Sequence, residues 1–385
     1  MEHPSHSLAH FPRLLLILTS SKAYIDHRVH LSIPYEHLYT TRKCTLVGEG
    51  CNLSETSLHT KNSHTKSLLL LKPRGFCAGV VRAIDIVRIA LEAFGRPIYV
   101  RKEIVHNRFV VEELQQKGAI FVDSVDEVPE GERVIYSAHG VSPEVREASK
   151  LRKLRVIDAT CPLVTKVHVE AVKFAKEGYS LILIGHRDHD EVIGTLGEAP
   201  TVTQVVGSPA EVDSVTLPNP DRVAYLTQTT LSLDETRDII AALRQRFPNI
   251  KGPAAQDICY ATENRQVAVK HVASDADLLL VVGSDNSSNS KRLVEVARSL
   301  GTEAHLIDDC RNIQPQWLNG VKTVALTAGA SAPEHLVQEV VQYLAGQGFG
   351  DVQELEIMPE NVRFGLPPEI VATIAAAPAS VALET

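Results

Sequence analysis

The feature that most constrains the fold is a pattern of strands and helices that occurs three times along the chain. From about Thr65, short β-branched apolar runs alternate with helical patterns, which is typical of α/β proteins with largely parallel sheets. A cysteine opens each unit, in "GFCAGVVRAI" (Cys77), "DATCPLVTKV" (Cys161) and "DICYATENRQ" (Cys259). A helical pattern follows each cysteine, and then come three strands, of which the first and the third end in polar residues.

The spacing of these features is nearly constant. The distance from the cysteine to the first polar loop is 29, 28 and 30 residues, and that to the turn after the third strand is 62, 68 and 72 residues. The landmarks are His106, His189 and Asn289 for the first loop, and His139, Thr229 and Ser331 for the turn. We therefore predict three similar α/β modules with mostly parallel sheets, arranged pseudo-threefold around a central site.

The predicted modules span residues 67–161, 162–255 and 256–345, and residues 346–385 form a C-terminal tail. Residues 1–66 have no helical or strand period and hold 8 of the 16 histidines, with seven basic and five acidic residues. They are interpreted as an extension, disordered or not native, with no part in the chemistry. A cleaved transit peptide and upstream sequence joined by a misplaced start are the alternatives.

The three cysteines at matched positions predict a metal site. Ligands in open parallel sheets bind outside the carboxyl ends of the strands, so the three modules would bring Cys77, Cys161 and Cys259 to one place. A single thiol is most often a small buried hydrophobe, but three in register are not explained that way. Structural zinc usually takes four ligands, whereas three thiolates on a four-iron cluster leave one iron open to a ligand.

The other cysteines do not share this pattern. Six cysteines in 385 residues are too few for a disulfide framework and suggest a reducing compartment. Cys44 and Cys51 have no partner motif, and Cys310 falls in the second strand of its module, where we interpret it as structural.

The polar loops suit a small anion such as a diphosphate. Each residue taken alone is explained equally well as a loop histidine or a helix N-cap. Together, histidines and hydroxyl or amide donors next to a helix N-terminus would receive a phosphate group well. The candidate residues are His106, His139, His189, Thr229, Ser287, Ser288, Asn289 and Ser331.

Glu191, in "GHRDHDEVIGT", is the carboxylate near the inferred centre that we single out as a proton donor. A cluster and an anion nearby would raise its pKa. Asp188 and Asp190 flank it and could serve instead.

Composition and missing motifs exclude several functions. A net charge of −8 gives no electrostatic basis for binding nucleic acid. No apolar run reaches the roughly 18 residues that a membrane helix needs. The chain has neither a Walker A loop nor a Rossmann glycine motif with its acidic partner, so we do not expect a nucleotide.

The motifs together resemble the 4-hydroxy-3-methylbut-2-enyl diphosphate reductase family, the LytB/IspH proteins. The resemblance covers about residues 68–365, and the matching stretches appear in order: "PRGFCAGV", "EIVHNR", "SAHGVS", "DATCPLVTKVH", "TQTTLS", "DICYATENRQ", "NSSNS" and "TAGASAP". It implies three α/β modules around a [4Fe-4S] cluster held by Cys77, Cys161 and Cys259. The remaining iron would bind the substrate alkoxide.

The resemblance also implies residue roles and a reaction. The eight polar residues given above would contact the substrate, with Thr229 also taking part in catalysis and Glu191 donating the proton. The reaction would remove the allylic hydroxyl with two electrons and two protons, and would yield isopentenyl and dimethylallyl diphosphates in the last step of the non-mevalonate isoprenoid pathway. Electrons would come from ferredoxin or flavodoxin, ultimately from NADPH. The location would be cytoplasmic, or plastidial if residues 1–66 are a transit peptide.

The chain departs from the family pattern at three positions. Asp190 stands where the family has proline between the histidine and the acid, Val81 where an acidic or neutral polar residue is common, and Asp285 where a basic residue is frequent. These departures bear on rate and substrate affinity. Two other classes remain open, an iron–sulfur hydro-lyase of aconitase type and a non-enzymatic iron–sulfur sensor.

Overall fold

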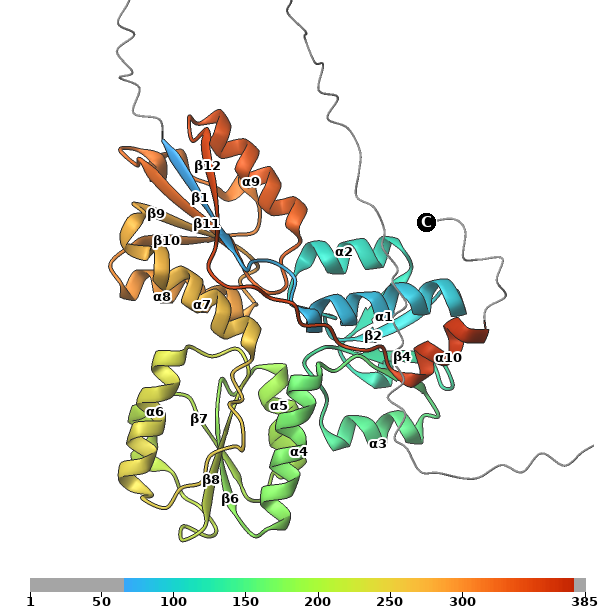
Figure 1. Ribbon diagram of the computed structural model, residues 1–385. Coiled ribbons are helices and arrows are strands. Elements are labelled where there is room, and N and C mark those ends of the chain that lie inside the picture. The colour runs from blue at the N-terminus through green and yellow to red at the C-terminus, as the bar shows by residue number, and fades with distance from the viewer. Residues whose placement is uncertain (1–65, 377–385) are drawn as a thin grey trace, which may run out of the picture. The chain divides into compact units, whose positions relative to one another are not determined.

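The computed structural model describes residues 66–376, and the predictions made for residues 1–65 and 377–385, Cys44 and Cys51 included, lie outside this range. The described residues form three separate sheets, and every strand pair in them is parallel (Figure 1). The predicted α/β class with parallel sheets is therefore confirmed.

The first sheet has four strands in the order β3-β2-β4-β5. Its strands are β2 (Ile98–Arg101), β3 (Ala119–Val122), β4 (Arg133–Tyr136) and β5 (Arg155–Asp158). The helices of this region are α1 (Ala78–Phe94), α2 (Arg108–Gln116) and α3 (Pro143–Leu151).

The second sheet has three strands in the order β7-β6-β8. Its strands are β6 (Ser180–Ile184), β7 (Thr203–Val206) and β8 (Val223–Thr227), and its helices are α4 (Pro162–Lys176), α5 (Asp190–Glu198) and α6 (Leu233–Arg246). All residues of β6 and β8 are buried, as expected where helices cover both faces of a parallel sheet.

The third sheet has five strands in the order β10-β9-β11-β1-β12. Its strands are β1 (Ser67–Lys72), β9 (Leu278–Val282), β10 (Glu303–Ile307), β11 (Thr323–Ala328) and β12 (Asp351–Glu356). The remaining helices are α7 (Tyr260–Val272), α8 (Ser288–Ser299), α9 (Glu334–Gly346) and α10 (Pro368–Ala376). Short 3-10 turns lie at Val125–Glu127, Pro209–Ser214, Ala273–Asp275, Cys310–Asn312 and Pro315–Leu318.

The same strand order recurs in the three sheets. In each, the first strand after the cysteine-bearing helix is central, with the second strand on one side and the third on the other: β3-β2-β4, β7-β6-β8 and β10-β9-β11. The repeat inferred from spacing is thus a repeat of topology. Because the first and third strands are neighbours in each sheet, their carboxyl-terminal loops lie at the same edge.

Two strands pair outside the modules in which the sequence boundaries put them. The predicted segment 67–161 contains β1, but β1 pairs with β11 and with β12, which lies in the predicted tail (Ser67 is opposite Thr323 and Asp351). The physical reason is burial: Leu68 and Leu71 are fully buried in two different apolar clusters, so β1 needs cover on both faces. The module boundaries themselves stay a prediction.

Cys310 differs slightly from its predicted place. It lies in the 3-10 turn Cys310–Asn312 that follows β10, not in the strand. Asp309 and Asn312 close this turn with reciprocal hydrogen bonds to its backbone. The Cys310 side chain packs against the core of the third sheet, which agrees with a structural role.

The segment after β12 crosses from the third sheet to the first helix, as Figure 1 shows for the red chain. The Arg82 Nε donates a hydrogen bond of 2.7 Å to the Gly365 carbonyl, and Ile370 of α10 is fully buried in the cluster that contains α1. The C-terminal segment therefore joins two of the sheets.

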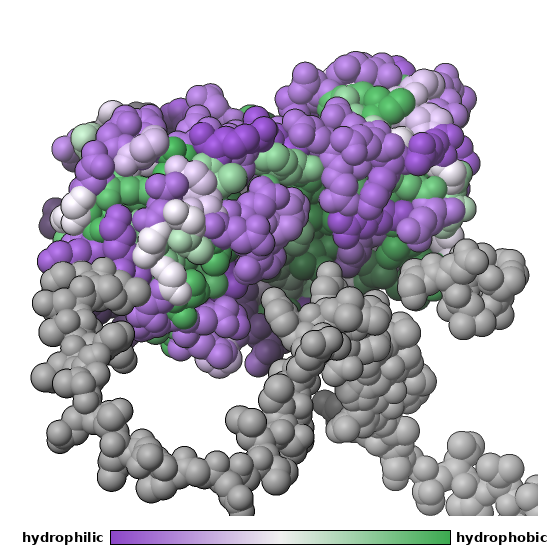
Figure 2. Space-filling model, turned by 90° about the horizontal axis from the view of Figure 1, so that it is seen from above, coloured by the Kyte–Doolittle hydropathy of each residue, from purple (hydrophilic) through white to green (hydrophobic). Residues whose placement is uncertain are grey.

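The face seen in Figure 2 is mostly polar, with apolar residues reaching the surface in patches between the polar ones. No helix among residues 66–376 is both long and apolar enough to cross a membrane.

Candidate active site

Each of the three cysteines in register caps a helix. Cys77, Cys161 and Cys259 are the N-cap residues of α1, α4 and α7. The N-terminus of a helix carries a partial positive charge, which favours an anionic thiolate there. All three side chains line one cavity.

Gly79 lets two of the sulfurs approach α1 closely. A Cβ atom at this position would lie 2.8 Å from the Sγ of Cys161 and 3.8 Å from the Sγ of Cys77. Any side chain larger than hydrogen would fill the space between them. Cys77 and Cys161, 84 positions apart in the sequence, therefore both place their sulfurs next to Gly79.

The cavity contains every residue that the sequence predicted for the site. Its lining comprises Cys77, Gly79, Val80, Val105, His106, Ala138, His139, Cys161, Val164, His189, Glu191, Thr229, Thr230, Cys259, Thr262, Ser287, Ser288, Asn289, Ala330 and Ser331. Polar loops from all three sheets thus face the three thiols.

Burial and mutual repulsion raise the pKa of two of the thiols, that of Cys161 to about 12 and that of Cys259 to about 11. Burial is the larger cause, and the neighbouring cysteines add to it. These two thiols are costly to ionise together without a cation, and a metal centre supplies one. The donor set therefore fits a thiolate-bound metal group.

Three histidines lie close together beside the thiols. The rings of His106 and His139 are stacked with centroids 3.9 Å apart, and His189 contacts both edge-on at 5.3 and 5.8 Å. Burial, followed by the charge of neighbouring histidines, lowers the pKa of His139 well below its usual value and that of His189 to about 3. Both rings are therefore neutral at physiological pH.

His189 is held in one tautomer. Its Nδ1 accepts a hydrogen bond of 3.2 Å from the Glu191 backbone N–H as part of the α5 cap, so the neutral ring carries its proton on Nε2. The Nε2–H is then free to donate to an anion in the cavity.

Glu191 is buried and bound to Thr229. Its Oε1 accepts the Thr229 backbone N–H at 2.6 Å, and its Oε2 accepts the Thr229 hydroxyl at 3.1 Å. Burial raises the pKa of Glu191 to about 7, against the opposing effect of these hydrogen bonds, and the charge of Asp257 adds to the rise. A carboxyl group with this pKa can hold and release a proton near neutral pH.

The α8 N-terminus supplies hydroxyl and amide donors. Ser287 caps the helix, and its hydroxyl accepts from the Ser290 hydroxyl at 2.9 Å. Ser288 donates to the Thr230 carbonyl at 3.3 Å. The Asn289 side-chain carbonyl accepts a hydrogen bond from the Ala330 N–H, and its amide donates one proton to the Thr262 hydroxyl. The second amide proton is therefore available to a ligand.

Ser331 links two modules across the cavity. Its hydroxyl donates a hydrogen bond of 2.9 Å to the His106 backbone carbonyl. The turn after β11 thus helps to fix the loop after β2.

Comparison with known proteins identifies the relatives of this architecture. The family model described as LytB protein matches residues 68–345. The chain belongs to the LytB family.

Curated members of the LytB family are similar over most of their length. The chain is 57% identical over 311 residues to a 4-hydroxy-3-methylbut-2-enyl diphosphate reductase of Leifsonia xyli, which covers 80% of this chain and 92% of the relative. It is 56% identical over 306 residues to the reductase of the same name in Acidothermus cellulolyticus. This match covers 79% of this chain and 90% of the relative.

A solved structure of a LytB-family member has the same fold. It is the E-1-hydroxy-2-methyl-but-2-enyl-4-diphosphate reductase from Plasmodium falciparum, with a TM-score of 0.79 and 43% identity, covering 81% of this chain and 98% of that chain.

The sequence did not predict two residues that contact a cysteine sulfur or the backbone next to a cysteine, Thr262 and Tyr260. Thr262, three residues after Cys259, places its hydroxyl 3.2 Å from the Cys259 Sγ, and this hydroxyl also accepts a hydrogen bond from the Asn289 amide. The Tyr260 hydroxyl accepts the Ala78 N–H at 3.2 Å. The Cys-x2-Thr spacing could have indicated Thr262, because N-cap and third helical residues meet.

Proposed function

We propose that this chain is a 4-hydroxy-3-methylbut-2-enyl diphosphate reductase that converts its substrate to isopentenyl and dimethylallyl diphosphates. The observation that carries the proposal is the single cavity in which three helix-capping cysteines face histidine, hydroxyl and amide donors from all three sheets. The curated relatives bear this name, and the reaction is the terminal step of the non-mevalonate pathway.

Cys77, Cys161 and Cys259 would hold a [4Fe-4S] cluster. The fit rests on three thiols at the positive ends of α1, α4 and α7 and on the raised thiol pKa values, which a cationic group would reverse. When bound, this cluster would supply electrons and a Lewis-acidic iron. Thr262 would stabilise the Cys259 thiolate through its hydroxyl proton.

The diphosphate would bind between the histidines and the α8 N-terminus. The neutral His189 donates from Nε2, and Ser287, Ser288 and Asn289 donate at the positive end of α8. His106, His139, Thr229 and Ser331 complete the substrate contacts that we propose. Several of these donors are occupied by protein acceptors, so the substrate must exchange partners with them.

Glu191 would protonate the leaving hydroxyl, either directly or through the Thr229 hydroxyl. Its position supports this role because both carboxylate oxygens contact Thr229, which lines the cavity. Hydroxide is a poor leaving group, and protonation lets it depart as water. The balance is two electrons and two protons taken up, one C–O bond broken and one water released.

We further propose ferredoxin or flavodoxin as the electron donor, with NADPH as the ultimate source, and a cytoplasmic location. The need for two electrons supports a small redox partner, and the four free cysteines among the described residues support a reducing compartment.

The test is an anaerobic assay with reduced methyl viologen and 4-hydroxy-3-methylbut-2-enyl diphosphate. Two viologen radicals should be consumed for each substrate, with isopentenyl and dimethylallyl diphosphates as products. Loss of water from the substrate without electron consumption would indicate a hydro-lyase instead. Cluster and substrate binding without turnover would indicate a sensor.

A further inference from the structure

A carboxylate in the loop after β2 contacts a histidine that lines the thiol cavity. Glu103 lies three residues before His106, and its Oε2 is 3.1 Å from the His106 Nδ1. His106 lines the thiol cavity, and it also lines a second cavity, which Glu103 lines as well. The carboxylate therefore acts on the thiol cavity through the imidazole ring.

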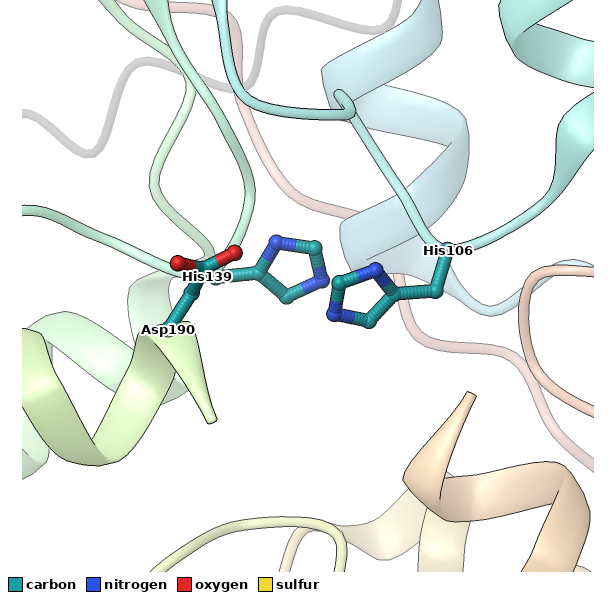
Figure 3. A group of neighbouring side chains, drawn as sticks. All are labelled: His106, His139 and Asp190. Atoms are coloured by element: carbon teal, nitrogen blue, oxygen red, sulfur yellow. The ribbon is translucent and has the colours of Figure 1, made fainter. Parts of the chain in front are cut away.

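This contact fixes the tautomer and the orientation of the His106 ring. Hydrogen bonding to His106 is the largest cause that lowers the pKa of Glu103, so the carboxylate is ionised and acts as the acceptor. The proton of this bond is then on the His106 Nδ1, and Nε2 lies on the other edge of the ring. The ring points toward that of His139, with which it stacks at 3.9 Å (Figure 3). Glu103 thus holds one edge of His106 and leaves the other edge for a ligand.

The same carboxylate oxygen connects this loop to the third sheet. The Asn286 amide donates a hydrogen bond of 2.6 Å to the Glu103 Oε2. Asn286 directly precedes Ser287, the N-cap of α8, and the first residues of α8 supply hydroxyl and amide donors to the thiol cavity. One oxygen atom therefore sets where the His106 ring lies relative to the start of α8.

Two other contacts join the same two parts of the chain through groups other than the His106 ring. The Ser331 hydroxyl donates a hydrogen bond of 2.9 Å to the His106 backbone carbonyl, and the Arg108 guanidinium donates one of 3.2 Å to Asp309. Because these contacts hold the loop independently, loss of the Glu103 carboxylate should free the ring and leave the backbone in place.

We propose that Glu103 is a positioning residue that lets His106 and the α8 N-terminus bind one diphosphate together, a role that rests on the proposed function of the cavity. A diphosphate has two phosphoryl groups and can contact both sets of donors at once, whereas orthophosphate has only one. The hydrogen bond from Nδ1 to Glu103 is the same in the neutral and in the protonated ring. An ionised Glu103 also offsets the positive charge of His106 when the ring is protonated.

The test measures anion affinity and turnover separately. Full-length protein is prepared anaerobically with its cluster, inorganic diphosphate and orthophosphate are titrated by isothermal calorimetry, and turnover is measured with reduced methyl viologen. Glu103→Ala removes the acceptor, whereas the carbonyl oxygen of Glu103→Gln can still accept both hydrogen bonds. Asp123→Asn is the matched control, because this exposed carboxylate lines the same second cavity but pairs with Lys102.

Glu103→Ala should bind diphosphate about tenfold more weakly, because it loses a charge-assisted hydrogen bond that orders a ligand donor. Its affinity for orthophosphate should stay within about threefold of the wild type, and KM should rise with little change in kcat. Glu103→Gln should recover most of the diphosphate affinity, and Asp123→Asn should match the wild type. The visible absorption of the cluster should be the same in all four proteins.

Wild-type diphosphate affinity in Glu103→Ala, or equal losses of affinity for diphosphate and orthophosphate, would overturn the proposal. The reductase reaction can fail separately. If the wild type and the variants bind the two anions as expected but the wild type consumes no viologen, the proposed reaction is refuted and the role of Glu103 in anion binding is supported.

Discussion

At the scale of single residues, the site depends on groups whose environments oppose their ordinary ionisation. Glu191 is 2% exposed and lies in a pocket shared with neutral histidines. Its carboxylate would be stabilised by two hydrogen bonds from Thr229, yet burial prevails and the pKa rises. Burial thus determines the chemistry available to this side chain.

Replacing Glu191 by glutamine should separate proton donation from cluster binding. The amide keeps the size and can keep one Thr229 hydrogen bond, but it has no acidic proton to give, so turnover should fall by about 10²- to 10⁴-fold. Iron content and the visible absorption of the cluster should stay unchanged. Glu147→Gln, at an exposed carboxylate of α3, serves as the control, and normal turnover by Glu191→Gln would show that another group supplies the proton.

The pH dependence of turnover follows from the same residue. Because the pKa of Glu191 is raised to about 7, the carboxyl keeps its proton below that pH and loses it above. The rate should fall as pH rises through about 7, by up to tenfold per unit where proton transfer limits it. Stopped-flow viologen oxidation between pH 5.5 and 9 checks this. A flat profile across that range would contradict the assignment.

The sequence predicted most of the side chains that line the site. It did not predict the neighbouring residues that hold those side chains in place. The cysteines, histidines and hydroxyls could be placed by matched spacing, because a repeated topology brings equivalent loops together. Thr262 does not recur at a matched position in the three modules, and only its spacing from Cys259 hints at it. Gly79 could not be found in this way, because its role depends on the space that a missing side chain leaves beside the sulfurs.

At the scale of secondary structure, helix starts position the thiols and strand ends position the ligand donors. Cys161 precedes Pro162, a residue favoured in the first turn of a helix, and Ser287 caps α8 with its own hydroxyl. Local sequence chemistry therefore fixes where the helices begin. The pairing of β1 with β11 was not predictable in this way, because the residues of an apolar strand do not indicate which strand it pairs with, here one more than 250 residues away.

Gly79→Ala tests how closely α1 approaches the thiols. Alanine normally favours a helix, but here its Cβ would lie 2.8 Å from the Cys161 Sγ, so the thiol or the helix must shift. We expect a cost of about 1–3 kcal/mol in unfolding free energy, and iron content well below that of the wild type. Thermal unfolding and iron per chain are the measurements.

Gly346→Ala in α9 is the matched control. Nothing lies within 4 Å of a Cβ at this position, so the same substitution should stabilise the chain by about 0.5 kcal/mol and leave iron content alone. A gain in stability with full iron content for Gly79→Ala would show that the contact with Cys161 does not limit the site.

At the scale of the described molecule, a buried ion pair connects the C-terminal segment to two of the cysteine turns. Arg265 is fully buried and pairs with Glu360 at 3.1 Å. Its guanidinium also donates to the carbonyls of Gly75, two residues before Cys77, and Ala261, two residues after Cys259. The segment 357–367 therefore helps to fix the turns that carry two thiols.

Glu360→Gln should destabilise the fold strongly because it leaves the Arg265 charge buried without a counter-ion. We expect a loss of about 3 kcal/mol in unfolding free energy, together with faster proteolysis of the segment after β12. Glu147→Gln, which breaks the exposed pair with Lys150, should change stability by less than about 0.5 kcal/mol. Similar thermal midpoints for the two variants would show that the Arg265–Glu360 ion pair does not hold the C-terminal segment against the cysteine turns.

The sheet position of β1 has a consequence for how the protein is made. This strand is the first described element to leave the ribosome, but its neighbours β11 and β12 begin at Thr323 and Asp351. At roughly 5–20 residues per second, synthesis of the intervening chain takes on the order of tens of seconds. Throughout that interval the leucines of β1 have no native cover, so the nascent chain must shield them until its last strand arrives.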